Sequence, residues 1–208
     1  MIATHKSVLL LLLAALPLHA QAGLEDFPFN REIFAIINGA RSPLMDYICN
    51  WLVFTGTGWV LIPTLLLIIK YWRGQIRAFL MGIALNFFVV NLLKSYFNQP
   101  RPTNFGDTII LGDTIFNGHV LYSFASLHYG SFPSGDVAQT AMLAAVLWPK
   151  KWQYRMLWVL FVLAIAWERM YAGVHFPLDV TSGAIIGASC GWLARLLIGL
   201  HITRSKSK

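Results

Sequence analysis

The sequence predicts an all-α membrane protein, a polytopic bundle of transmembrane helices. Its 208 residues are 57% hydrophobic and only 12% charged, with a mean hydropathy of +0.60. Ordinary soluble domains are about 45–50% apolar and about 25% charged. At about 20 residues per crossing, the length allows five or six spans and no separate soluble domain. The aromatic content of 14% and the long apolar runs exclude a disordered chain.

The first 22 residues have the pattern of a secretory signal peptide. Lys6 precedes an apolar run from Val8 to Leu18, and Ala20-Gln21-Ala22 has the small-x-small form of a signal-peptidase site. We therefore expect residues 1–22 to be a signal peptide and residues 23–208 to form a single membrane domain with five spans. In the alternative interpretation the segment is retained as a first span, which gives six. Both interpretations start the domain outside the cytoplasm.

Five apolar stretches are predicted to span the membrane. Before them, the segment Phe29–Tyr47 mixes charged and apolar residues as an amphipathic segment at the membrane surface does. The predicted spans are Trp51–Ile69, Ile76–Leu93, Val137–Trp148, Met156–Tyr171 and Val180–Leu200. The third is short, so its start must include residues between Phe132 and Asp136.

Basic residues between the spans predict the topology. Lysine and arginine concentrate in cytoplasmic loops. They gather in three segments, namely Lys70, Arg73 and Arg77, then Lys150, Lys151 and Arg155, and finally Arg204, Lys206 and Lys208. Alternation then places the long 98–132 loop and the turn 172–178 on the outer side of a plasma membrane, or in the periplasm of a Gram-negative cell. The net charge of +7 therefore comes mostly from basic residues in the predicted cytoplasmic loops. Because these residues form no continuous basic stripe, we expect no nucleic-acid partner.

Several ionisable residues remain at the outer ends of the predicted spans, where charge is costly in hydrocarbon and indicates function. They are Lys94, Arg101, Asp136, Glu168, Arg169, His175 and Asp179. Arginine offers a planar fork to phosphate oxygens, and lysine offers a compact charge. Three cations at one face therefore predict a site for a phosphate group, although each residue alone has an ordinary interfacial explanation.

Two predicted helix starts complete this site. Ser134 can cap a helix that begins at Gly135, whose free N–H groups would point toward an oxyanion. His175 lies just before Pro177, a favoured first helical residue, so Asp179 falls in the first turn and can reach the imidazole. A carboxylate on one ring nitrogen leaves the lone pair of the other free to attack phosphorus. The pattern predicts a nucleophilic histidine beside a phosphate cradle.

Three motifs resemble, in order, those of the type 2 phosphatidic acid phosphatase and vanadium haloperoxidase superfamily. They are Lys94-Ser-Tyr-Phe-Asn-Gln-Pro-Arg101-Pro102, Phe132-Pro133-Ser134-Gly135-Asp136 and Arg169-Met-Tyr-Ala-Gly-Val-His175-Phe-Pro-Leu-Asp179. The resemblance implies a six-helix core and a phosphatase that needs no metal or other cofactor. It also implies that Lys94, Arg101, Ser134, Gly135 and Arg169 bind phosphate, that His175 is the nucleophile and that Asp179 orients it.

The sequence departs from the family pattern at two positions. Glu168 stands where the third motif usually has serine, and Asp136 stands where the second motif usually has the histidine that protonates the leaving group. Aspartate is ordinarily ionised at neutral pH. Three explanations stay open at this point: Asp136 is the acid, His119, His128 or water replaces it, or the enzyme is impaired.

The sequence therefore predicts an integral-membrane phosphatase that acts on lipid phosphates or diphosphates through a phosphohistidine. The alternatives are phosphotransfer to another lipid or sugar, and a non-catalytic protein that binds lipid phosphates. A transporter is disfavoured, because the charged groups lie at one face rather than near the midplane. The candidate substrates are undecaprenyl diphosphate, phosphatidylglycerol phosphate, phosphatidic acid and lipid A phosphate, and the oligomeric state is open.

Overall fold

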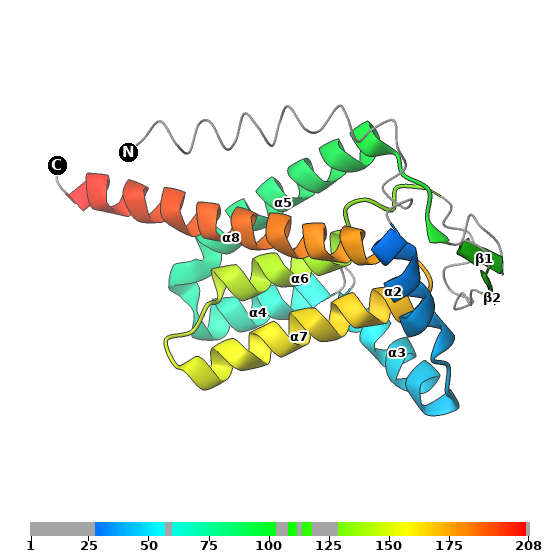
Figure 1. Cartoon of the computed structure of the whole chain (residues 1–208). Helices are drawn as coiled ribbons and strands as arrows, with labels where there is room; N and C mark the ends of the chain where they lie inside the picture. Colours follow the sequence, from blue (N-terminus) through cyan, green and yellow to red (C-terminus); the bar gives the residue numbers. More distant parts are fainter. Residues whose placement is uncertain (1–27, 57–59, 103–107, 112–113, 118–128, 207–208) are drawn as a thin grey trace.

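Helices form most of the computed structural model, which describes residues 28–56, 60–102, 108–111, 114–117 and 129–206. The helices are α2 (Pro28–Gly39), α3 (Pro43–Gly56), α4 (Leu61–Tyr71), α5 (Ile76–Phe97), α6 (Gly135–Val146), α7 (Trp152–Tyr171) and α8 (Pro177–Lys206), and the 3-10 turn η3 (Arg73–Gln75) precedes α5. In Figure 1, α6, α7 and α8 run side by side, and α2 and α3 lie at one end of this bundle. The predicted signal peptide, His119 and His128 fall outside the described residues.

Helix α6 is the central helix. All of its residues from Val137 to Val146 except Gln139 are buried, and it contacts α5, α7 and α8. Its 12 residues extend only about 18 Å, well short of the ~30 Å hydrocarbon layer of a bilayer. The third predicted span is short because other helices, rather than lipid, surround it.

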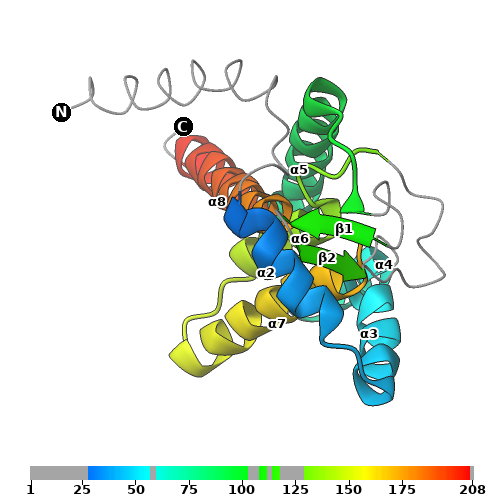
Figure 2. The ribbon, with the colours of Figure 1, turned by 45° about the vertical axis from the view of Figure 1, so that its right-hand side comes forward.

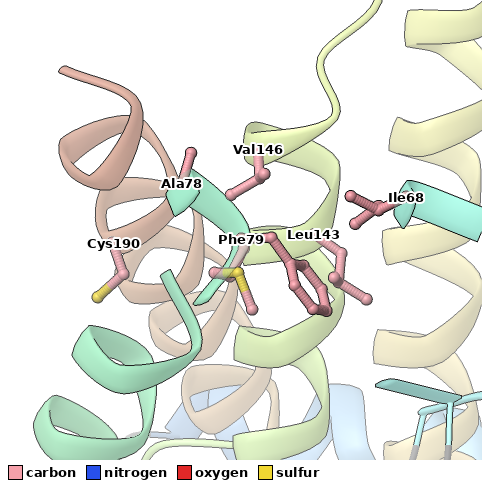
Figure 3. Packing of buried hydrophobic residues seen from close by; sticks show 7 residues of the cluster. Ile68, Ala78, Phe79, Leu143, Val146 and Cys190 are labelled. Carbon is pink, nitrogen blue, oxygen red and sulfur yellow. The ribbon is translucent and has the colours of Figure 1, made fainter. Parts of the chain in front are cut away.

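An apolar cluster holds α4, α5, α6 and α8 together at the end of the bundle away from α2. Phe79 of α5, Leu143 and Val146 of α6, Ile68 of α4 and Cys190 of α8 pack in one group (Figure 3). Four of these five residues are at most 2% exposed, and Cys190 is 7% exposed. This packing fixes the positions of the helices whose other ends carry the predicted site residues.

A row of glycines lets α8 lie directly on the backbone of α6. Gly183, Gly187 and Gly191 recur every fourth residue on one face of α8. A Cβ atom at Gly187 would lie 1.9 Å from the carbonyl oxygen of Ala138, and one at Gly183 would lie 2.5 Å from that of Ser134. Small residues at this spacing allow the closest helix contacts in membrane proteins. The row brings the start of α8 against the start of α6.

The first prediction concerns this row. Gly187→Ala places a methyl group on the Ala138 carbonyl, so α6 and α8 must separate and the protein is destabilised by about 1–3 kcal/mol or more. We expect a lower melting temperature and lower phosphatase activity in detergent. The control is Gly199→Ala on the same helix, where an added Cβ would meet nothing within 4 Å. Equal melting temperatures for the two variants would contradict the close-contact interpretation.

The observed helices agree with two of the predicted spans and differ from one. Among the described residues, two helices are long and apolar enough to cross a membrane, Arg73–Phe97 and Pro177–Gly199, and only 28% of each apolar window is buried. They contain most of the second and fifth predicted spans. The continuous span Trp51–Ile69 is wrong, because α3 ends at Gly56 and α4 begins at Leu61. Glycine is a poor helix former, and the sequence has Gly58 two residues after Gly56.

Two further features differ from the sequence expectation. The amphipathic segment Phe29–Tyr47 is divided between α2 and α3, and Pro43 opens the second helix in the position that proline favours. The all-α prediction holds for the bundle, but the 98–132 loop contains an antiparallel hairpin of β1 (Thr108–Leu111) and β2 (Thr114–Asn117). Figures 1 and 2 show this hairpin at the same end of the bundle as α2 and α3.

Candidate active site

The predicted nucleophile lies in the turn between α7 and α8. The His175 side chain is 2% exposed, its Nδ1 atom lies 3.6 Å from Oδ2 of Asp179, and its Nε2 atom lies 3.4 Å from Nη1 of Arg101. Burial lowers the pKa of His175 well below its ordinary value of 6.5, and the charges of Arg101 and Lys94 lower this pKa further. The imidazole is therefore neutral. Nδ1 faces the carboxylate at a distance too long for a hydrogen bond and has no hydrogen-bond partner among the described residues, whereas Nε2 faces the guanidinium.

The carboxylate of Asp179 is held by two donors. The backbone N–H of Phe176 donates to Oδ2 at 2.8 Å, and the hydroxyl of Ser131 donates to the same oxygen at 2.5 Å. The N–H of Ser134 also donates to the backbone oxygen of Asp179 at 3.0 Å, which ties the start of α6 to the start of α8. Sequence analysis missed Ser131, because an isolated serine before a motif carries no pattern of its own.

The second prediction concerns Ser131 as a positioning residue. Ser131→Ala removes one donor from the Asp179 carboxylate, so the imidazole is held less firmly. A hydrogen bond to a charged group contributes about 1.5–3 kcal/mol, which corresponds to a loss of roughly tenfold to hundredfold in kcat. Steady-state kinetics with one lipid phosphate measures it. Ser131→Thr keeps the hydroxyl and should restore most of kcat, whereas equal rates for both variants would exclude this role.

Three predicted phosphate ligands meet around the loop before α6. Lys94 Nζ donates a hydrogen bond to the carbonyl of Gly130, and Nη2 of Arg101 donates to the same carbonyl at 3.3 Å. A Cβ at Gly135 would lie 3.8 Å from Cε of Lys94, so the first turn of α6 faces the lysine. Gly130 therefore holds both cations near His175.

Ser134 occupies the N-cap position of α6, as predicted. Its backbone is extended, but its side chain makes no cap hydrogen bond. The residue is fully buried, and its Oγ atom has no hydrogen-bond partner among the described residues. An unpaired buried hydroxyl is unfavourable in itself. A bound phosphate oxygen would supply the missing partner, which fits the predicted role of Ser134.

Both departures from the family pattern contact the third cation. Nη1 of Arg169 is paired with Oδ2 of Asp136 at 2.9 Å, and Nε is paired with Oε2 of Glu168 at 2.5 Å. Nη2 also donates to the carbonyl of Val53 at 3.4 Å. Arg169 and Glu168 are buried, whereas the Asp136 side chain is 32% exposed. Of the two carboxylates that bind Arg169, Glu168 is buried with it, whereas Asp136 is accessible from outside the protein.

All predicted site residues therefore lie at one end of the bundle. They come from the C-terminal ends of α5 and α7, the loop after α5, the N-terminal end of α6, and the start of α8. They are Lys94, Arg101, Ser134, Gly135, Asp136, Arg169, His175 and Asp179. The arrangement offers a neutral nitrogen nucleophile, three cations and a buried hydroxyl around one small anion.

Comparison with known proteins identifies the family. The PAP2 superfamily profile matches residues 75–202, which is more than half of the chain. The chain belongs to the PAP2 superfamily. The crystal structure of Aquifex aeolicus LpxE is similar, with a TM-score of 0.72 and 39% identity over 83% of this chain and 98% of that one.

Two examples from the similar proteins have names that state an activity. The undecaprenyl-diphosphatase of Sulfolobus acidocaldarius is 27% identical over 202 residues, covering 94% of this chain and 91% of that protein. The lipid A 4'-phosphatase of Bacteroides thetaiotaomicron is 29% identical over 175 residues, covering 78% and 73%. The predicted superfamily is confirmed, and this PAP2 protein is a phosphatase of the hydrolase class. The relatives also support the prediction of a membrane protein.

Proposed function

We propose that this protein is a multi-pass membrane enzyme that hydrolyses lipid phosphates or diphosphates through a phosphohistidine. The observation that carries the proposal is the neutral imidazole of His175, with one nitrogen toward Asp179 and the other facing Arg101. The phosphoryl group of a substrate would bind between the guanidinium of Arg101 and the nucleophilic lone pair of His175. Nothing in this chemistry requires a metal ion, because the cations of the chain neutralise the phosphate.

In the proposed reaction, the substrate phosphate enters between Arg101 and Nε2 of His175. The Nε2 lone pair forms a bond to phosphorus, and the bond from phosphorus to the lipid oxygen breaks. Lys94, Arg101 and Arg169 stabilise charge on the phosphoryl oxygens, and Asp179 stabilises the imidazolium. Water then attacks phosphorus, inorganic phosphate leaves, and the neutral imidazole returns.

Asp136 is the proposed acid for the leaving group. Its side chain is partly exposed and paired with Arg169, and a bound phosphate group would compete for the same guanidinium. The displaced Asp136 side chain can then lie beside the lipid oxygen, and in the proposed role it donates a proton to that oxygen.

Two alternatives share this site. Phosphotransfer would use the same intermediate with an alcohol in place of water. A non-catalytic lipid-phosphate binder is favoured by the ion pair between Arg169 and Asp136, because a carboxylate that never leaves the arginine cannot act as an acid. Turnover with release of inorganic phosphate distinguishes the proposal from both.

The third prediction tests the activity. Purified protein in detergent should release inorganic phosphate from at least one of undecaprenyl diphosphate, phosphatidylglycerol phosphate, phosphatidic acid and lipid A, with equal rates with and without a metal chelator. His175→Ala removes the only proposed nucleophile, so we expect a loss of at least a thousandfold, or about 4 kcal/mol of barrier. The melting temperature of the variant serves as the folding control. Activity within about tenfold of the wild type would exclude His175 as the nucleophile.

The fourth prediction concerns the acid. A lipid alkoxide is a poor leaving group and needs a proton, whereas a phosphate monoester leaves readily from a diphosphate. Asp136→Asn should therefore lose much of the 10²–10⁴-fold contribution of a general acid with a monophosphate, and clearly less with a diphosphate of the same lipid. The measurement is kcat/KM for both substrates. Equal losses with the two substrates would assign Asp136 to binding.

The site is proposed to face away from the cytoplasm. Most basic residues of the described chain that lie outside the site are at the opposite end, at the end of α4 and the start of α5 and between α6 and α7, whereas Arg31 and Arg41 are at the site end. Those at the opposite end include Lys70, Arg73, Arg77, Lys150, Lys151 and Arg155. The described acidic residues are on α2, α3 and the site ends of α6, α7 and α8. This polarity follows the rule that places basic residues in the cytoplasm.

The fifth prediction tests the orientation. Tyr129→Cys, at an exposed position beside the site, should react with a membrane-impermeant thiol reagent added to intact cells. Gly74→Cys, in the turn at the other end, should react only after the membrane is permeabilised. The native Cys49 and Cys190 are buried, which keeps the background low. The reverse labelling pattern would turn the site toward the cytoplasm.

A further inference from the structure

A groove leads away from the phosphate site between α4, α5 and α6. Its volume is about 270 Å³, and Lys94, Gly135 and Asp136 line one end of it. Gly135, Asp136 and Gln139 are the three residues of α6 that are not buried, and all three line this groove. The surface of α6 is therefore exposed only along this groove.

Beyond its phosphate end, the groove is lined by apolar residues and by the three amides Asn86, Asn91 and Gln139. Ile83, Phe87 and Val90 of α5 and Met142 of α6 provide apolar surface, and Phe87 is 70% exposed at the lip. Asn86 lies among them and is 7% exposed. Its side-chain oxygen Oδ1 is buried and has no hydrogen-bond partner among the described residues. An unpaired buried acceptor costs about 1–3 kcal/mol, yet an apolar residue would fill this place without that cost.

Asp136 indicates which part of a substrate enters the groove. It is the acid in the proposed function, on which this inference rests, so the leaving lipid lies on its side of the phosphate. Asn86 is eight residues before Lys94 on α5, which places it roughly 12 Å along the helix axis from the phosphate end. A group that meets Asn86 is therefore part of the lipid and lies well beyond the atoms next to phosphorus.

We propose that Asn86 selects a lipid whose leaving part carries an O–H or N–H donor on an otherwise apolar chain, about 10 Å from phosphorus. The side-chain oxygen accepts that hydrogen bond. Lipids with β-hydroxyacyl chains have such a donor at this distance. Polyprenyl diphosphates and phosphatidic acids with plain acyl chains have none, so they leave Asn86 unpaired.

The test uses two phosphatidic acids that differ only in one group. One carries β-hydroxyacyl chains, and the other carries plain acyl chains of the same length. The wild type should hydrolyse the first with a kcat/KM at least about tenfold higher, because a site built for a donor rejects the lipid that lacks it. In Asn86→Leu this ratio should fall to about one, and the melting temperature should stay equal or rise, because an unpaired polar group has been removed.

The matched control is Ser95→Leu, which also replaces a polar residue of α5 by leucine. Ser95 is exposed and does not line the groove, so the ratio should stay at the wild-type value. Asn86→Ala gives the same readout if Asn86→Leu does not accumulate. A ratio near one in the wild type, or an unchanged ratio in both Asn86 variants, would overturn the inference while leaving the phosphatase proposal intact. Hydrolysis of no lipid phosphate by the wild type would overturn both.

Discussion

The contact between α6 and α8 is the constraint on which the rest of the structure depends. Because Gly183, Gly187 and Gly191 form one row on α8, the two backbones touch along it, and the N-termini of both helices meet at one point. Ser134 at the start of α6 donates from its backbone to Asp179 at the start of α8. The phosphate cradle and the orienting carboxylate are therefore parts of one junction, and a small change in helix spacing would separate them.

Around this junction the chain balances charge within the protein. Glu168 is fully buried beside Arg169, where the guanidinium offers its carboxylate a charged hydrogen bond and the Cys49 thiol donates to the other carboxylate oxygen. Asp136 binds the other edge of the same guanidinium from a partly exposed position. Glu168 and Asp136, the two departures from the family pattern, therefore act on the same cation. Arg169 is held between two carboxylates at positions where the family pattern has serine and histidine.

Much of the site could be predicted because its residues lie at the ends of apolar segments, where charge stands out. Lys94, Asp136, Arg169 and Asp179 were located in this way, and helix ends do meet at one face. The break between Gly56 and Leu61 could not be predicted from hydropathy, since the apolar content continues across it. A role for Asn86 could not be predicted either, because a single amide inside an apolar span does not indicate a function until the residues packed around it are known.

The contacts of the phosphate group alone do not separate substrate from product. In the proposed complex Lys94, Arg101 and Arg169 bind the phosphoryl oxygens whether the phosphate is part of the lipid or free. Such contacts are similar for substrate and product, so they cannot by themselves favour the lipid ester over released phosphate. The selective part of the binding energy then has to come from the lipid in the groove along α5. On this argument the open face of α6, rather than the cations, separates lipid-linked phosphate from the free anion.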